Sequence, residues 1–261
     1  MIQLSQSLVD THCHLDMPVF DADREAVLDR AREAGVGRIM VPGVDLPSSR
    51  RAVKLAEAHP EVFAAVGFHP HDADKLGEKE LKELRELAAH PKVKAIGEIG
   101  LDYYRDHSPR NVQRAAFRQQ LDLAAELDLP VIIHNREAYA DVMAALSEWN
   151  GKRRGVLHSY SGDRTQMSAA LELGFFLGLT GPITFPKADE MRAVAASAPL
   201  DKLLIETDAP YLTPSPHRGR RNEPAYVRYV AQKLADARGE NLDTVITQTC
   251  ANAAMLFNWS Q

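Results

Sequence analysis

Short apolar runs rich in Val, Ile and Leu alternate along the chain with longer stretches in which apolar residues recur at helical spacing. One run and one helical stretch together take roughly thirty residues, the length of a strand-and-helix unit. The apolar runs are continuous, which is typical of strands buried on both faces of a parallel sheet. The pattern predicts eight strands: a first run that ends at residue 12, then 38–44, 63–68, 93–97, 130–133, 155–157, 175–180 and 203–205.

A helix is expected after every predicted strand. The helical ranges are 21–35, 47–59, 78–90, 111–129, 137–149, 163–173, 187–198 and 223–238, with a last helix at 243–257. Because eight such units fill the 261 residues, we predict an α/β fold, a TIM (β/α)8 barrel, as a single domain over residues 1–261. An open doubly wound sheet is the nearest alternative, but its glycine-rich phosphate loop is missing after the first strand, where the chain reads DTHCH.

Composition and charge narrow the class of protein. With 45% hydrophobic and 26% charged residues, the chain resembles a water-soluble domain with one large core. Its formal net charge of −5 argues against a general nucleic-acid coating protein, but not against an enzyme that meets a polyanion only at its active site. The short polar start at 1–8, the lack of an apolar membrane segment and the presence of only two cysteines lead us to expect a cytoplasmic protein without a membrane partner.

His12 and His14 stand at the end of the first predicted strand. Residues two apart in a strand project to the same face, so both imidazoles are expected on one face and Cys13 on the other. Two neutral imidazoles close together form half of a site for Zn, Mn or Fe. Alone, the pattern favours a polar strand end whose histidines are hydrogen-bonded.

Ionisable residues also stand at the ends of other predicted strands. In a closed barrel the carboxyl ends of the strands converge, and a cluster of ionisable groups at the rim of an apolar core is costly unless the groups are paired or ligate metal. We therefore predict a metal site. Its candidate ligands are His12, His14, Glu98, His134, His158 and Asp208.

The number of candidate ligands indicates two divalent ions, Mg²⁺, Mn²⁺ or Zn²⁺, rather than one ion with an open position. Glu98 can offer one oxygen to each ion, and such a pair of ions turns a bound water into a hydroxide nucleophile near neutral pH. Asp208 is then both a ligand and the catalytic base for that water. Glu206, two residues earlier, either orients water or a ligand as a second catalytic group or pairs with a buried donor.

The chain resembles the TatD family of metal-dependent deoxyribonucleases, which belong to the amidohydrolase-like hydrolases with a TIM-barrel fold. The matching segments run from one end of the chain to the other: DTHCHLD at 10–16, VGFHPH at 66–71, AIGEIGLDYY at 95–104, LPVIIHNREA at 129–138, LHSYSG at 157–162, GPITF at 181–185, LLIETDAPYLTP at 203–214 and RGRRNEP at 218–224. Asn135, Ser159 and Tyr160 depart from residues that are common in relatives. None of these departures replaces a candidate ligand.

The resemblance implies a division of the ligands between two ions. One ion would be held by His12, His14, Glu98 and Asp208, and the second by Glu98, His134 and His158, with Glu98 shared. It also implies a phosphodiesterase that removes nucleotides from the 3′ ends of DNA and prefers single strands. We expect DNA as the substrate and a monomer.

Supporting residues have a functional and a structural interpretation each. His69, away from the candidate ligands, is predicted to contact a substrate phosphate. Arg136 either contacts a substrate phosphate or pairs with the helix that starts at Glu137. Asp10 shares a face with His12 and is interpreted as a partner of a ligand, whereas Asp102 is interpreted as a turn former.

The basic segment at 217–222 either lines a groove for a nucleic-acid backbone or fixes a long loop to the rim of the barrel, and the second interpretation is favoured. Tyr103, Tyr104 and Tyr160 are expected on the side of the barrel where bases would stack.

Two other functions are compatible with the same residues. One is hydrolysis of an amide, lactone or ester bond by the same two-metal hydroxide. The other is a catalytically silent barrel that serves as a binding scaffold, which the full set of ligand types disfavours.

Overall fold

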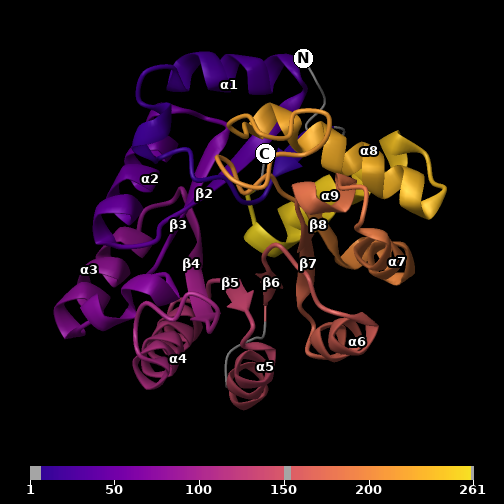
Figure 1. Ribbon diagram of the computed structural model, residues 1–261. Helices are drawn as coiled ribbons and strands as arrows, with labels where there is room; N and C mark the ends of the chain where they lie inside the picture. The colour runs from indigo at the N-terminus through magenta and orange to yellow at the C-terminus, as the bar shows by residue number, and fades with distance from the viewer. Residues whose placement is uncertain (1–6, 150–153, 260–261) are drawn as a thin grey trace. The chain divides into compact units, whose positions relative to one another are not determined.

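The computed structural model describes residues 7–149 and 154–259, in which strands and helices alternate (Figure 1). The strands are β1 (Leu8–Asp10), β2 (Val36–Pro42), β3 (Val62–Val66), β4 (Val93–Asp102), β5 (Val131–Arg136), β6 (Gly155–Leu157), β7 (Phe176–Leu179) and β8 (Leu203–Ile205). Their order in the sheet follows their order in the chain. The predicted fold class, the (β/α)8 barrel, is therefore confirmed.

Helices occupy the stretches between and after the strands. They are α1 (Arg24–Glu33), α2 (Leu46–Ala58), α3 (Glu78–Ala88), α4 (Arg110–Glu126), α5 (Tyr139–Glu148), α6 (Arg164–Glu172), α7 (Asp189–Ser197), α8 (Val227–Arg238) and α9 (Leu242–Phe257). Short 3₁₀ helices are η2 (Pro18–Phe20), η3 (Pro70–Lys75), η4 (Gly181–Thr184), η5 (Leu200–Lys202) and η6 (Pro224–Tyr226). Among the described residues, no helix is long and apolar enough to cross a membrane.

The chain divides into two compact units. The first comprises Met1–Val41, Ser159–Ser168 and Phe176–Gln261, and the second comprises Pro42–His158 and Ala169–Phe175. The first unit contains the pairs β1–β2 and β7–β8, and the second contains β3 to β6; all of these strand pairs are parallel. The assignment of residues 1–261 to a single domain stays a prediction.

In the second unit, α3, α4 and α5 lie along one side of β3, β4 and β5 (Figure 1). The strands are apolar and buried: every residue of β3 is buried, as is β4 apart from Lys94. The helix α2 begins where the Asp45 side chain accepts a hydrogen bond from the backbone N–H of Ser48 at 2.7 Å, next to Pro47 in the first turn.

Two strands extend further than the apolar pattern predicts. β4 continues to Asp102 and β5 to Arg136, because they stay paired beyond their apolar parts, with Gly100 opposite His134. Gly100 has φ of 141°, and a Cβ atom there would lie 2.0 Å from the carbonyl oxygen of His134, so only glycine fits. Glu98 and His134 consequently lie within strands rather than after them.

Candidate metal centre

The imidazoles of His12 and His14 face each other just beyond β1. Their Nε2 atoms are 3.2 Å apart, and both residues are buried. The two rings share a face, as the two-residue spacing predicts, while Cys13 forms an isolated parallel bridge with Ala209. Burial raises the pKa of the Cys13 thiol well above its ordinary value, so this residue is not a source of thiolate.

Asp208 completes this first group of side chains. Its Oδ1 lies 3.6 Å from Nε2 of His14 and 3.9 Å from Nε2 of His12. The backbone N–H of Asp208 donates to the carbonyl of His12 at 2.8 Å, and the N–H of His14 donates to the carbonyl of Ala209 at 2.8 Å. These two backbone hydrogen bonds join the segments after β1 and β8, so they hold the carboxylate beside both rings.

Glu206 is fully buried and accepts hydrogen bonds on both oxygens. Oε1 accepts from the Thr11 hydroxyl at 3.3 Å, and Oε2 accepts from the Ser159 backbone N–H at 3.0 Å. A Cβ atom on Gly178 would lie 2.3 Å from Oε1, so the glycine leaves the space that the carboxylate occupies. The pairing of Glu206 with buried donors, one of its two predicted interpretations, is therefore present.

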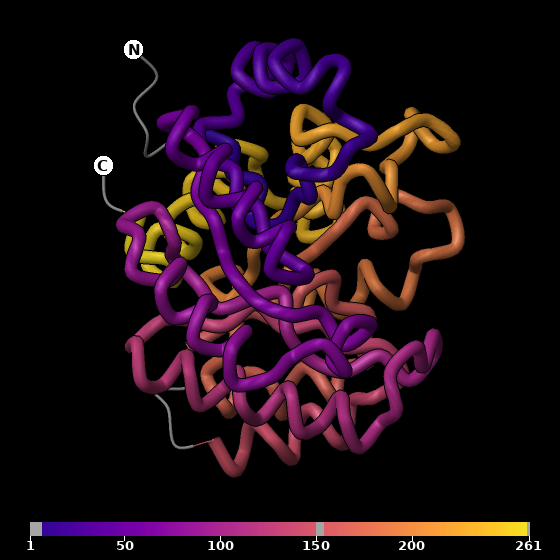
Figure 2. The backbone as a smooth tube through the Cα atoms, turned by 90° about the vertical axis from the view of Figure 1, so that its left-hand side faces the viewer, coloured from indigo at the N-terminus to yellow at the C-terminus, as the bar shows by residue number. Residues whose placement is uncertain are grey.

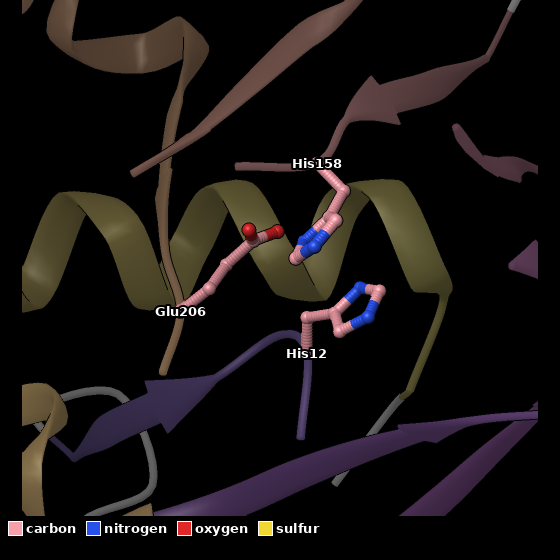
Figure 3. A group of neighbouring side chains, drawn as sticks. All are labelled: His12, His158 and Glu206. Atoms are coloured by element: carbon pink, nitrogen blue, oxygen red, sulfur yellow. The ribbon is translucent and has the colours of Figure 1, made fainter. Parts of the chain in front are cut away.

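Glu206 also lies close to the first group. Figure 3 shows the side chains of Glu206 and His12 on the segments that follow β8 and β1, and their ligand atoms are within 4.8 Å of each other. The two-residue strand repeat does not extend from Glu206 to Asp208, because β8 ends at Ile205 and Asp208 has a φ of 57°. The two carboxylates therefore differ in setting, one fully buried and one partly exposed.

Asp10 forms hydrogen bonds with the residues next to the first group. Its carboxylate accepts hydrogen bonds from the backbone N–H of Thr207 at 2.9 Å, from the Thr207 hydroxyl and from the backbone N–H of His12 at 3.3 Å. Burial raises the pKa of Asp10 to about 8, although the hydrogen bonds from Thr207 act in the opposite direction. Asp10 thus fixes the backbone on both sides of the group, rather than a ligand ring.

A second group of side chains lies in the second unit. Nδ1 of His134 is 2.9 Å from Oε1 of Glu98, and Nε2 of His69 is 3.7 Å from the same oxygen. The rings of His69 and His134 have centroids 4.4 Å apart. The expectation that His69 lies away from the candidate ligands is therefore wrong, because the parallel register of β3, β4 and β5 brings the ends of these strands together.

Two glutamine side chains of α4 form hydrogen bonds with the backbone near the second group. The side chain of Gln120 accepts from the Phe68 backbone N–H at 2.7 Å and donates to the Phe68 carbonyl at 3.1 Å. The side-chain oxygen of Gln113 accepts from the Asp102 N–H at 2.9 Å. Both glutamines are buried. The backbone next to His69 and Asp102 is thereby held in place.

Asp102 joins the second group through its carboxylate. Oδ2 lies 3.2 Å from Nε2 of His134 and 2.9 Å from Nε2 of His71, while Oδ1 accepts from the backbone N–H groups of Tyr104 and Arg105. Burial raises the pKa of Asp102, but the hydrogen bonds from His134, His71 and Arg105 outweigh it and leave the pKa well below its usual range.

His134 is therefore held between two carboxylates. Burial has the largest influence on the pKa of His134 and lowers it, yet the hydrogen bonds with Asp102 and Glu98 leave the pKa above its ordinary value. With Nδ1 directed at Glu98 and Nε2 at Asp102, the ring has a fixed orientation. This arrangement suits a metal-binding histidine whose second nitrogen donates to a carboxylate.

The interpretation of Asp102 as no more than a turn former is incomplete. Asp102 does cap a turn, but its other oxygen contacts two histidines, and the rings of His71 and His107 stack with centroids 4.5 Å apart. A signal for Asp102 exists in the sequence: positions 98, 100 and 102 share one face if the strand continues through them.

The two other predicted site residues of the second unit lie at the ends of β5 and β6. Arg136 is exposed and places its guanidinium over the ring of Tyr104, with Cζ 3.8 Å from the ring centroid. His158, also labelled in Figure 3, is buried directly after β6, and its backbone N–H donates to the Ile133 carbonyl at 2.9 Å.

The basic segment at 217–222 is bound to the first unit's own surface. Arg221 donates to both carboxylate oxygens of Asp23, at 2.8 and 2.6 Å, and the buried amide of Asn222 donates to the carbonyls of Thr207 and Tyr211. Figure 2 shows the orange stretch after β8 beside the indigo stretch that contains α1. Arg221 and Asn222 thus fix the loop, as the favoured interpretation predicts.

A cavity of about 660 Å³ lies in the first unit on the loops after β6 and β7. Arg218 lines it and stacks on the ring of Phe185, with Cζ 3.8 Å from the centroid. Its other charged residues are Asp163, Lys187 and Glu190, so positive and negative charges balance. None of the described side chains that line it belongs to the two groups.

The donor sets of both groups fit a divalent metal ion. Imidazole nitrogens and carboxylate oxygens suit Mg²⁺, Mn²⁺ and Zn²⁺. In the first group two ring nitrogens at 3.2 Å stand beside a carboxylate, and in the second a ring nitrogen stands 2.9 Å from the buried carboxylate of Glu98. A buried carboxylate is stable only with a cation or hydrogen-bond donors nearby, and a metal ion supplies the former.

Comparisons with known proteins point to one family. The family model described as TatD related DNase matches residues 9–258. A metal-dependent hydrolase of Bacillus subtilis, YabD, is 43% identical over 251 residues, which cover 96% of this chain and 98% of YabD. The 3′-5′ ssDNA/RNA exonuclease TatD of Erwinia tasmaniensis is 39% identical over 258 residues, which cover 96% of this chain and 100% of that protein. The crystal structure of the TatD homologue YjjV from Escherichia coli matches with a TM-score of 0.93 and 36% identity, covering 99% of this chain and 100% of YjjV.

Proposed function

Because this chain belongs to the TatD-related DNase family of metal-dependent hydrolases, we propose that it is an exonuclease that removes nucleotides from the 3′ ends of single-stranded DNA. The relative from Erwinia tasmaniensis carries the name of a 3′-5′ ssDNA/RNA exonuclease and is similar over its whole length, which supports the same reaction class. The observation that carries the proposal is the pair of histidine and carboxylate groups, one in each unit. The presence of only two cysteines, Cys13 and Cys250, both buried, supports a reducing compartment such as the cytoplasm.

Each group is proposed to hold one divalent ion. His12, His14 and Asp208 hold the first, and Glu98 and His134 with His158 hold the second. His69 is an additional donor beside Glu98, at 3.7 Å. A bridge by Glu98 between the two ions stays a prediction.

The residues in and around the two groups have different proposed roles in the reaction. Divalent ions bound by these residues would lower the pKa of a water molecule and neutralise charge on the phosphate oxygens. The Asp208 carboxylate is partly exposed beside both rings of its group, so it is the proposed base that takes the proton of the attacking water. Glu206 is fully buried with both oxygens occupied by donors, so its proposed contribution is to orient the neighbouring His12. Arg136, exposed at the end of β5, is the proposed contact for a substrate phosphate.

The test is cleavage of a single-stranded oligonucleotide labelled at its 5′ end, with Mn²⁺ or Mg²⁺ added or with EDTA. We expect a ladder of products shortened from the 3′ end only when metal is present. Glu98→Gln and Asp208→Asn are each expected to reduce kcat about 100-fold or more, because each removes an ionised ligand. Glu86→Gln on the exposed face of α3 is the matched control and should cleave like the wild type.

Two results would contradict the proposal. An oligonucleotide that stays intact beside rapid, metal-dependent hydrolysis of a lactone, amide or carboxylic ester would favour the alternative hydrolase. Absence of bound metal by elemental analysis, after incubation with Mn²⁺ and Zn²⁺, would favour a silent binding scaffold.

A further inference from the structure

An exposed aromatic ring with a guanidinium beside it lies on the loop after β4. Tyr104 is 54% exposed, and Cζ of Arg136 is 3.8 Å from the centroid of its ring. Cζ of Arg105 lies 5.7 Å from the same centroid. The three residues belong to the second unit, which also contains Glu98 and His134.

The two arginines beside Tyr104 are available to an anion. Across residues 7–149 and 154–259, neither Arg105 nor Arg136 forms an ion pair with a carboxylate. The arginines of the helix α4, in contrast, do form ion pairs. Arg110 pairs with Asp106 at 3.0 Å, and two other arginines of this helix also pair with acidic residues. In a chain with a net charge of −5, two uncompensated cations at one ring mark a local site for a polyanion.

Tyr104 is tied to the second group through Asp102. Oδ1 of Asp102 accepts from the Tyr104 backbone N–H at 3.0 Å, and Oδ2 lies 3.2 Å from Nε2 of His134. The strand register places Asp102 opposite Arg136. One buried carboxylate therefore sets the position of the ring relative to the histidine, and the adjacent strand carries the arginine.

The preceding tyrosine does not share these properties. The hydroxyl of Tyr103 donates to the Asp141 carboxylate, and Arg114 also contacts that hydroxyl at 3.2 Å. Tyr103 is only partly exposed. Its ring is thus engaged within the protein, whereas most of the Tyr104 ring faces solvent.

We propose that Tyr104, Arg105 and Arg136 form a stacking platform for an unpaired nucleobase of the substrate, with the two guanidiniums holding the adjacent phosphates beside the Glu98–His134 group. An aromatic ring stacks on any base, and arginine adds both cation–π contact and a planar fork for phosphate. The inference rests on the proposed nuclease function and names the substrate class of that site. A base within a duplex is covered on both faces, so the platform favours single strands.

The experiment uses the full chain and single-stranded oligonucleotides that carry 2-aminopurine at one of the first four positions from the 3′ end. Binding is measured by fluorescence in EDTA, so that no cleavage occurs. We expect stacking on Tyr104 to quench one of these positions. Tyr104→Leu should abolish that quenching and weaken binding roughly tenfold to a hundredfold, while Tyr104→Phe and Tyr104→Trp should retain both.

Charge is tested separately from stacking. Arg136→Ala should weaken binding about tenfold at low salt and make the affinity less dependent on salt, because a phosphate contact is lost. Arg118→Ala removes an exposed arginine of the same unit that pairs with Glu148 at 2.9 Å, and it should bind like the wild type. Thermal melting of every variant shows whether it is folded.

The proposal is overturned if no 2-aminopurine position responds to wild-type protein, or if Tyr104→Leu quenches and binds as the wild type does. Because this readout needs no turnover, it decides the platform independently of the proposed function. If the wild type binds the strand through Tyr104 but never cleaves it with metal, the exonuclease proposal fails and the platform stands. In active protein, the loss of kcat/KM in Tyr104→Leu should be at least tenfold larger for a single strand than for a duplex.

Discussion

One carboxylate oxygen of Asp102 lies 3.2 Å from Nε2 of His134, while Nδ1 of the same ring faces Glu98 at 2.9 Å. A histidine whose far nitrogen donates to a carboxylate has its proton fixed there and its other nitrogen free for a metal ion. Asp102 thereby determines which nitrogen of His134 faces Glu98.

Replacement of Asp102 by Asn should weaken metal binding in the second unit. The amide removes the negative charge beside His134, so we expect one of the measured Mn²⁺ affinities to fall about 10- to 100-fold. Isothermal titration of the purified variant checks the affinity. Asp106→Asn, an exposed change four residues away, is the control, and equal affinities in the two variants would show that Asp102 does not act through His134.

Metal binding should depend on pH through His134. Hydrogen bonds with Asp102 and Glu98 leave the pKa of His134 above its ordinary value, so at low pH a proton occupies the ring that a metal ion needs. Affinity should be full above this raised pKa and fall about tenfold for each pH unit below it, if one proton is released. In Asp102→Asn the midpoint should move to lower pH. A midpoint unchanged by that substitution would contradict the assignment.

Asp10 should affect stability rather than metal affinity alone. Asp10→Ala leaves the buried N–H of Thr207 without its acceptor, so we expect a loss of about 1–3 kcal/mol in the free energy of unfolding. Asp10→Asn keeps an acceptor and should lose less. Urea denaturation at pH 7 compares the variants.

The pH dependence gives an independent check on Asp10. Its pKa is about 8 in the folded protein and near 4 in the unfolded chain, so the folded state binds the extra proton between these values. The contribution of Asp10 to stability is therefore full below pH 4 and declines as the pH rises towards 8. Relative to the wild type, Asp10→Asn should become more stable between pH 5 and pH 8, and a constant difference would refute the buried, protonated carboxyl.

Arg221→Ala should loosen the loop after β8 without affecting the second group. The guanidinium holds the pKa of Asp23 at about 2, so the folded state favours the ionised carboxylate. This contribution is present above the unfolded pKa near 4 and is lost as the pH falls towards 2. The difference in melting temperature between wild type and variant should accordingly shrink over that range, in contrast to a difference caused by lost packing.

Within the described residues, the apolar pattern predicted the location of the strands β1 to β8 and of the helices α1 to α9, because each of these elements buries a local run of side chains. The short 3₁₀ helices were not predicted. Gly155–Leu157 and Leu203–Ile205 begin and end where the sequence predicted. The predicted ends of β4 and β5 lie too early in the chain, because Gly100 is small and His134 is polar. Pairing between the two strands extends both of them beyond their apolar parts. Residues in such extensions have no apolar signal of their own.

The sequence by itself determined which residues are candidate ligands, since His12, His14, Glu98, His134, His158 and Asp208 follow from residue type and position at strand ends. Only the tertiary structure decided their neighbours. The contact of Asp102 with His71 and His134, and the place of His69 beside Glu98, depend on register between strands that are about thirty residues apart. Local spacing fixes the face to which a side chain points within its own strand, whereas hydrogen bonds between strands determine which faces meet.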